Sequence, residues 1–111
     1  MLAKRFHLPV QQFSARTAKS FHQNLCMIKI APNAFSYPRV GVVVGSRVSK
    51  GAVKRNKIRR MFFREMQLII AHPSTKLSGR DILILVKPEA TRAEPKEITE
   101  EIKNFFTKQN V

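Results

Sequence analysis

Residues 40–60 read VGVVVGSRVSKGAVKRNKIRR, a β-branched run followed by a short loop and a dense set of cations. The valine run at residues 40–45 predicts a strand buried on both faces, because valine favours extended backbone and no polar residue interrupts it. Beyond the loop, the pattern predicts a helix over residues 52–71. It ends there because Pro73 disfavours helical backbone at the residue before it. The other predicted elements are arranged around this strand–loop–helix unit.

The helix over residues 52–71 has two different sides. A largely apolar stripe recurs at helical spacing and predicts contact with a sheet; its members are Ile58, Phe62, Glu65 and Ile69, with Met61 and Leu68 beside them. The cations lie away from the centre of this stripe. We therefore expect one side of the helix to cover a sheet and the rest to be electropositive.

Two more strands and a final helix follow from composition and spacing. Residues 25–30 and 81–87 are strongly apolar and predict strands. Pro95 suits the first turn of a helix in which apolar residues recur at helical spacing, namely Ile98, Ile102, Phe105 and Phe106. Because a helix separates the strand at 40–45 from the strand at 81–87, the three form a β-α-β unit. Such a unit favours parallel pairing of its strands.

The N-terminal region is expected to be less regular. Residues 1–8 read as a mobile basic arm, and Pro9 can open a short helix that fades by Lys19. The predicted order is then α-β-β-(β)-α-β-α, in a single domain of residues 1–111, since a chain of this length builds one core. The predicted fold class is α+β, a single α-β sandwich whose sheet is covered mainly on one face.

The charge of the chain is segregated. Residues 1–64 contain fourteen Lys or Arg and no Asp or Glu, whereas residues 65–111 contain seven basic and seven acidic side chains. The whole formal charge of +14 therefore arises in the first part. Positive charges at this density repel one another, and a polyanionic partner offsets the repulsion. Nucleic acid is favoured over a membrane surface, because the basic helix must also cover a sheet; an acidic protein partner is harder to exclude.

The densest cations gather in the loop and helix that follow residue 45. Arginine forks can bridge phosphate oxygens, lysines offer point charges, and a helix N-terminus favours anions. Asn56 can read a base edge or a 2′-hydroxyl, or hold an arginine in place. The candidate phosphate-binding residues, called the basic set below, are Arg47, Lys50, Lys54, Arg55, Asn56, Lys57, Arg59, Arg60 and Arg64.

The sequence offers no recognisable catalytic constellation. Its three histidines are far apart and none has a carboxylate within a few residues, and Cys26 has no local base. No carboxylate pair suggests a two-metal site, so we predict no catalytic residue and no metal ligand on this chain. A lone cysteine allows no internal disulfide and favours a reducing cytoplasm. No apolar run is long enough to cross a membrane.

Residues 38–86 resemble the protein subunit of bacterial ribonuclease P. The resemblance lies in Val40-Gly41 before Val43-Val44, in SRVSK at 46–50, in AVKRNKIRR at 52–60, and in a strand that opens with Asp81. Three positions depart from the family pattern. Lys57 stands where the signature usually has its second arginine, Arg59 stands where lysine is usual, and Phe63 occupies a position that is commonly arginine.

The resemblance implies an α-β sandwich with a left-handed β-α-β crossover, against the usual right-handed rule. It also implies a ribonucleoprotein that removes the 5′ leader from precursor tRNA. In that assembly the RNA subunit performs the hydrolysis and is expected to hold most of the assisting Mg²⁺. This chain would be a monomeric accessory subunit, one protein per ribonuclease P RNA.

The resemblance also implies roles for particular residues. The basic set would bind the catalytic RNA, and the single-stranded leader would lie between the sheet and the first helix, against Phe13, Arg16, Lys19, Met27 and Lys29. Phe13 keeps two interpretations, since it can pack in the core or offer a face on which unpaired nucleotides stack.

Other functions share the same charge. A structural RNA-binding protein of ribosomal type would need no catalytic partner, and a DNA-binding module would place the basic helix in a major groove. A stand-alone nuclease is least favoured, because the sequence lacks a catalytic constellation. The Ala-Val-Lys-Arg-Asn motif at residues 52–56 favours ribonuclease P.

Overall fold

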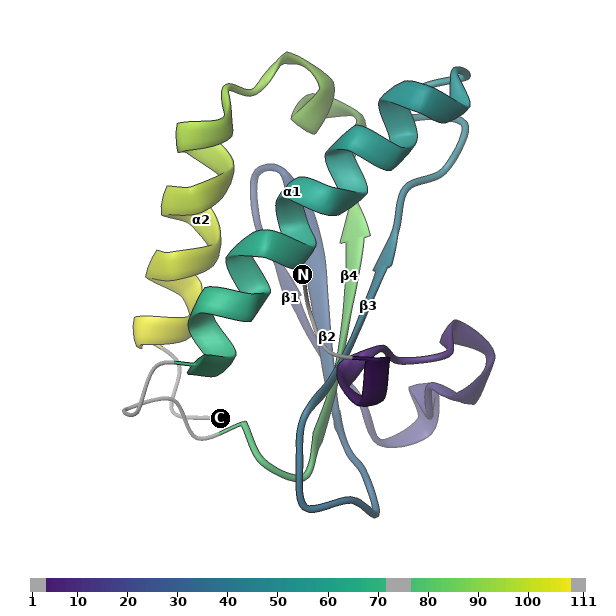
Figure 1. Ribbon diagram of the computed structural model, residues 1–111, viewed down its shortest axis with the longest axis vertical. Coiled ribbons are helices and arrows are strands. Elements are labelled where there is room, and N and C mark those ends of the chain that lie inside the picture. Colours follow the sequence, from purple (N-terminus) through teal and green to yellow (C-terminus); the bar gives the residue numbers. More distant parts are fainter. Residues whose placement is uncertain (1–3, 72–76, 109–111) are drawn as a thin grey trace.

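The computed structural model describes residues 4–71 and 77–108, which form one four-stranded sheet and two α-helices (Figure 1). The spatial order of the strands is β1-β2-β4-β3. β2 pairs antiparallel with both β1 and β4, whereas β3 pairs parallel with β4. The strands are β1 Lys19–His22, β2 Cys26–Pro32, β3 Arg39–Val43 and β4 Arg80–Val86, and the helices are α1 Ala52–Ala71 and α2 Pro95–Lys108.

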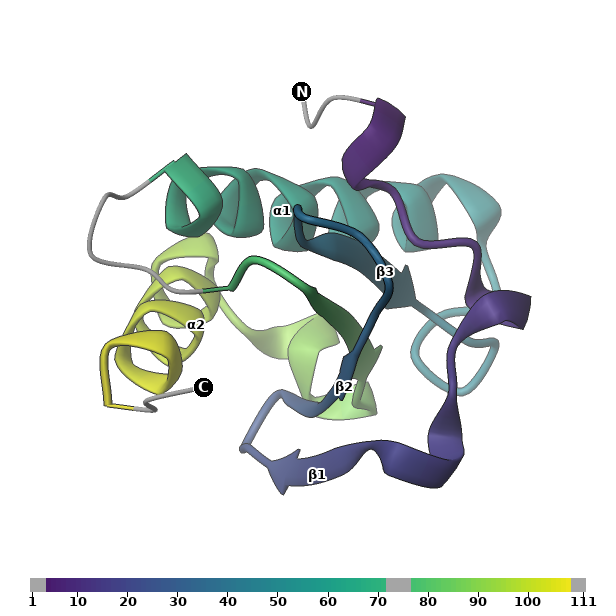
Figure 2. The same cartoon turned by 90° about the horizontal axis from the view of Figure 1, so that it is seen from below.

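The β3–α1–β4 unit is a left-handed crossover. In Figure 1 both parallel strands run upward, α1 lies in front of the sheet, and the chain moves from β3 on the right to β4 on the left. Figure 2, seen from below, agrees with this arrangement. The parallel pairing predicted from the intervening helix is confirmed, and so is the unusual hand that the resemblance implied.

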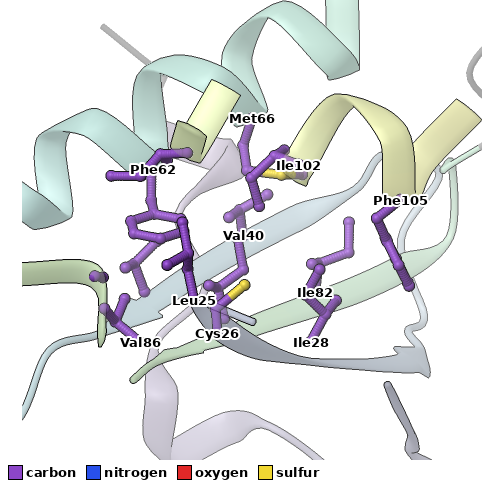
Figure 3. Close-up of a cluster of buried hydrophobic side chains, with 14 of the residues drawn as sticks. Leu25, Cys26, Ile28, Val40, Phe62, Met66, Ile82, Val86, Ile102 and Phe105 are labelled. Carbon is purple, nitrogen blue, oxygen red and sulfur yellow. The ribbon is translucent and has the colours of Figure 1, made fainter. Parts of the chain in front are cut away.

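The core lies between the sheet and both helices (Figure 3). Alternate strand residues point toward the helices; Ile28, Val40 and Ile82 are all fully buried there. α1 contributes Ile58, Phe62 and Met66, and α2 contributes the four apolar residues predicted from its spacing, Ile98, Ile102, Phe105 and Phe106. The C-terminal half of the α1 stripe differs from the prediction, because Met66 is fully buried whereas Leu68 is 62% exposed.

The N-terminal helix that Pro9 was expected to open is not an α-helix. Three short 3₁₀ turns replace it, η1 Lys4–Phe6, η2 Val10–Gln12 and η3 Ala15–Thr17. η2 and η3 bury none of their residues and have no side-chain cap. A short helix without an apolar face to bury and without a cap is marginal in water, which explains why the prediction was wrong here.

Part of the segment expected to be a basic arm packs on the sheet. Leu8 is 5% exposed and its N–H donates to the carbonyl of Val40 at 2.8 Å. His7 forms an isolated bridge with the same valine. Residues 1–3 of the expected arm lie outside the described residues.

The strand β1 was not predicted from the sequence. It has four residues, lies at the edge of the sheet, and is only half-buried at its most covered position, Phe21. That ring packs edge-on against Phe105 of α2, with centroids 5.2 Å apart. A strand this short gives too brief an alternation to identify, so tertiary contacts determine it.

Candidate nucleic-acid interface

The exposed side of α1 carries a row of cations. Lys54, Lys57, Arg60 and Arg64 are all exposed. Spacings of three and four residues place them along the side of the helix away from its buried residues. Figure 1 shows this helix lying across the front of the molecule, with nothing drawn in front of it along most of its length. A row of four exposed cations on one helix is an arrangement that suits the regular charges of a phosphate backbone.

Arg55 belongs to the basic set but also shapes the loop before α1. Its Nη1 donates to the carbonyl of Ser49 at 2.9 Å and to that of Lys50 at 2.8 Å. The N–H of Gly51 donates to Ser49 Oγ at 3.3 Å. The Arg55 side chain is partly buried. Arg55 therefore holds the loop that presents Arg47 and Lys50.

Asn56 and Arg59 act together on the same helix. Arg59 Nη1 donates to Asn56 Oδ1, so the amide holds an arginine in place, which is one of the uses foreseen for it. The Asn56 side chain is exposed, and its NH₂ group, which takes no part in this bond, carries two further donors. An arginine oriented in this way loses less freedom when it binds a phosphate.

Phe63, at the position where the family commonly has arginine, packs against the N-terminal segment. Its ring lies 5.0 Å from that of His7, at an interplanar angle of 32°. Phe63 is half-buried and contacts the core. The neighbouring Arg64 is exposed, so a cation remains on this part of the helix, on the side away from the sheet.

The face of the sheet opposite the helices, called the outer face, is crossed by the N-terminal segment (Figure 2). The crossing begins at Gly41, where an added Cβ would lie 3.3 Å from both the Leu8 carbonyl oxygen and Leu83 Cδ1. This glycine lets the two backbones approach closely. η3 then contacts β2 before the chain enters β1.

Two of the predicted leader-binding residues share the outer face. Met27 and Lys29 alternate with the buried residues of β2, so they point away from the helices, and both are half-buried. Phe13 and Arg16 come from the segment that crosses this face; Phe13 is half-buried and Arg16 is exposed. Within the described residues, Phe13 is not among the apolar side chains that form or touch the core.

Lys19 is the exception among the predicted leader-binding residues. It pairs with Ile30 in the β1–β2 register, and Ile30 points into the core. Directly paired residues point to the same side of a sheet, so Lys19 belongs to the helix side. This placement separates Lys19 from the other candidates, because a helix ending at Lys19, as expected from the sequence, imposes no such alternation.

A hollow of about 380 Å³ opens on the outer face where β3 and β4 end. It is lined by His22, Met27, Gly45, Ser46, Arg47, Val48, Leu85, Val86, Lys87 and Pro88. The walls combine apolar side chains with three groups that can be cationic. An unpaired nucleotide needs both, since its base stacks on apolar surface and its phosphate seeks positive charge.

A second hollow, of about 350 Å³, lies next to the first. Arg47, Val48 and Pro88 line both hollows. The second adds Arg92, from the 3₁₀ turn η4 Pro88–Arg92. Arg47, in the loop that leads to α1, thus lines both hollows, and the second also contains the carboxylate of Glu89.

His22, Lys87 and Arg92 were missed as candidates by the sequence reasoning. Lys87 could have been found from the predicted parallel pairing of the strands at residues 40–45 and 81–87. Parallel strands end at the same edge of a sheet, where ligands commonly bind, so residues just after β3 and β4 must meet. His22 could not be found without β1. Lys87 is also tied to the β1–β2 turn, since its Nζ donates to the Gln23 carbonyl at 2.6 Å.

The surroundings of Cys26 indicate a structural role and not a reactive thiol. It is fully buried, and its thiol donates to Glu101 Oε2 at 3.4 Å, while the Leu25 N–H donates to both oxygens of the same carboxylate. Burial, with the nearby Glu101 charge, raises the pKa of the Cys26 thiol, and a protonated buried thiol is a poor nucleophile. Glu101 of α2 thus anchors the β1–β2 turn.

Among residues 4–71 and 77–108, no three His, Cys, Asp or Glu side chains are grouped so that they could hold a metal ion. None of the helices in this part of the chain combines the length and the apolar character that crossing a membrane requires.

Comparison with known families gives one consistent result. The family model Ribonuclease P matches residues 11–110 of this chain. The ribonuclease P protein component of Parasynechococcus marenigrum is 41% identical over 69 residues, which cover 62% of this chain and 53% of that relative. The one from Clostridioides difficile is 31% identical over 93 residues, 84% of this chain and 79% of the relative. The chain thus matches only about half the length of the cyanobacterial relative.

Solved structures with the same fold are also similar. A Staphylococcus aureus RNase P protein mutant with defective mRNA degradation activity superposes with a TM-score of 0.78 at 18% identity, over 91% of this chain and 85% of that one. The Thermotoga maritima RNase P protein in complex with 1-(4-fluorophenyl)-2-thiourea gives 0.71 at 20% identity, over 84% and 87%. At these identities the likeness concerns the fold.

Proposed function

Because the chain belongs to the ribonuclease P protein family, we propose that it is the protein component of a ribonuclease P and assists removal of the 5′ leader from precursor tRNA. The observation that carries this proposal is the exposed cation row of α1, set beside a loop that Arg55 holds in place. The basic set would bind phosphates of the catalytic RNA. The outer face would bind the single-stranded leader.

Two surfaces of the protein support the proposed division of labour. α1 is a rigid helix whose cations match a backbone but carry little sequence information, as expected for contacts with RNA phosphates. The outer face offers half-buried Met27, Phe13 from the crossing segment, and a hollow with basic walls. These features favour an unpaired strand, whose bases can stack. One protein would thus hold enzyme RNA and substrate RNA together and reduce the repulsion between them.

Catalysis is proposed to belong to the RNA partner. Mg²⁺, held chiefly by that RNA, would assist the phosphodiester hydrolysis. The described carboxylates of this chain do not form a cluster that fits a metal ion, so we assign no step to a metal held by the protein. The protein would act by binding and orienting the substrate, as a monomer with one copy per RNA. A cytoplasmic site of action is part of this proposal, supported by the lone, unpaired cysteine.

The test is reconstitution. The purified chain, mixed with ribonuclease P RNA from the same organism, should restore cleavage of a 5′-labelled precursor tRNA at a low Mg²⁺ concentration at which the RNA alone is inactive. A matched pair of variants separates the cation row from charge in general. K57A/R60A/R64A should lose most of this activity, whereas K96A/K103A/K108A, which removes three exposed lysines of α2, should keep it.

The alternative, a structural RNA-binding protein of ribosomal type, predicts a different outcome. Such a protein would bind structured RNAs yet leave the cleavage rate of the RNA unchanged at every Mg²⁺ concentration. That result would refute the proposed function. Sequencing of RNA that copurifies with the chain gives an independent readout, because the proposal requires a single abundant structured RNA of several hundred nucleotides.

A further inference from the structure

A buried ion pair lies at the other end of the outer face from the two hollows. Arg39 and Asp81 face each other across the parallel β3–β4 pair and are 8% and 3% exposed. Arg39 Nε donates to Asp81 Oδ1 at 2.9 Å, and Nη2 donates to Oδ2 at 2.8 Å. Because both charges lose their hydration, such a pair adds little net stability. The role of the pair therefore lies in the segments that it holds in place and not in its contribution to the stability of the fold.

The pair is the centre of a network that reaches two other segments. Arg39 Nη1 donates to Gln12 Oε1 at 3.1 Å, and its guanidinium carbon stands 4.6 Å from the centroid of the Phe35 ring. Asn33 Nδ2 donates to Asp81 Oδ1 at 2.9 Å. The network thus joins η2 and the β2–β3 loop to the two parallel strands.

Gln12 lies beside Phe13 in a segment that has little structure of its own. η2 and η3 are single 3₁₀ turns without buried residues or side-chain caps, and such turns are not stable alone. Leu8 anchors the segment at one end, and β1 anchors it at the other. Between these ends, the bond from Arg39 to Gln12 connects the segment to the buried ion pair of β3 and β4.

We propose that Arg39, fixed by Asp81, is a positioning residue for substrate recognition. Through Gln12 it sets where Phe13 and Arg16 lie over the outer face, and so it controls how well the single-stranded leader is held. This inference rests on the proposed function. It concerns the leader alone, because none of the network contacts described above involves the basic set.

The experiment compares Gln12→Ala with Gln11→Ala in the complex reconstituted with ribonuclease P RNA. Both glutamines are exposed and lie in the same turn, but only Gln12 is bonded to Arg39 in the contacts above. Dissociation constants are measured for precursor tRNA and for mature tRNA, which lacks the leader. Affinity for the RNA subunit and thermal unfolding of each variant are measured in parallel.

Gln12→Ala should weaken binding of precursor tRNA by up to roughly tenfold, because the segment must then be ordered on binding without a hydrogen bond to a charged group. Binding of mature tRNA, affinity for the RNA subunit and the behaviour of Gln11→Ala should stay at wild-type values. An equal loss for both tRNAs, or no loss for either, overturns the inference. If the wild-type complex itself binds both tRNAs equally, the leader-binding part of the proposed function fails instead.

Discussion

Arg55 and Arg60 carry the same charge but have different surroundings. Arg55 bonds two carbonyls of the loop before α1, whereas Arg60 is exposed on the cation row. A charged side chain that bonds its own backbone supports the fold as well as any ligand. Charge alone therefore does not tell which members of the basic set are free to bind RNA.

Replacing these two arginines should separate the two roles. Arg55→Ala should lower the unfolding free energy by about 1 kcal/mol, which corresponds to a fall in Tm of about 4–8 °C for a chain near this size. Arg60→Ala should leave Tm unchanged and weaken RNA binding alone. Thermal unfolding and binding to the RNA subunit at one fixed salt concentration measure both. Equal Tm values for the two variants would contradict this assignment.

Cys26 predicts a loss of stability at alkaline pH. The pKa of the buried thiol is raised above the value in the unfolded chain, which is about 8.5. Below that pH the thiol is protonated in both states, so its stabilising contribution is fully present. Above it, only the unfolded chain releases the proton, and the unfolding free energy should fall by up to about 1.4 kcal/mol per pH unit.

Denaturant unfolding between pH 8 and 10.5 measures this slope, and Cys26→Ala is the control. The variant should have a shallower slope over the same range, because no thiol remains to titrate. The same slope in both proteins would assign the alkaline loss to other groups. In the folded wild type, a thiol reagent should react slowly at pH 8 and rapidly once denaturant is added.

At the scale of elements, α1 combines a core-facing side with an exposed side that carries cations. Ile58, Phe62 and Met66 fix its orientation on the sheet. Because the helix cannot rotate without exposing these residues, the cation row keeps one direction. The row can therefore act as a unit toward a polyanion.

The salt dependence of RNA binding tests whether α1 acts in this way. Each phosphate contact contributes about 0.9 for a duplex, or about 0.7 for a single strand, to the slope of log affinity against log salt. K57A/R60A/R64A should therefore reduce the slope by about 2–3. The α2 control K96A/K103A/K108A should leave it nearly unchanged. A similar reduction in both variants would indicate binding through net charge alone.

The alternation of side chains between the two faces of the sheet leads to a further prediction for β1 and β2. Lys29 lies on the outer face, whereas Lys19 lies on the helix side. Lys29→Ala should weaken binding of precursor tRNA about fivefold, as for one contact of about 1 kcal/mol, and should not affect mature tRNA. Lys19→Ala, the matched control, should change neither. A leader-specific loss in Lys19→Ala would place the leader on a different side of β1.

The whole molecule concentrates its excess positive charge in residues 1–64. In the folded state these residues supply the N-terminal segment, three of the four strands and most of α1, so their charges are brought close together. Compaction of like charges opposes folding. Anions that bind the folded state should offset this cost.

Multivalent anions should therefore stabilise the free protein more than simple screening does. Addition of inorganic phosphate or sulfate should raise Tm by several degrees more than sodium chloride of equal ionic strength. The K57A/R60A/R64A variant should show a smaller difference between the two kinds of salt. Equal Tm at equal ionic strength would indicate screening only, without anion sites.

Much of the architecture could be predicted because its signals are local. The valine run of β3, the apolar run of β4 and the helical spacing of Ile98 and Ile102 each identify an element within a few turns of chain. The cations of α1 could be predicted in the same way, because the helical period determines on which side of the helix each residue lies. The N-terminal segment and β1 have no such periodicity, and both were missed or assigned wrongly.

By itself, the sequence determined the fold class, the parallel β-α-β unit and the charged side of α1, because helix and strand periods are properties of neighbouring residues. The folded structure was needed to tell exposed cations such as Arg60 from bonded ones such as Arg55. It also placed Lys19 on the helix side and joined Arg39 to Gln12. The physical reason is that these outcomes depend on contacts between segments distant in the chain, which local patterns do not encode.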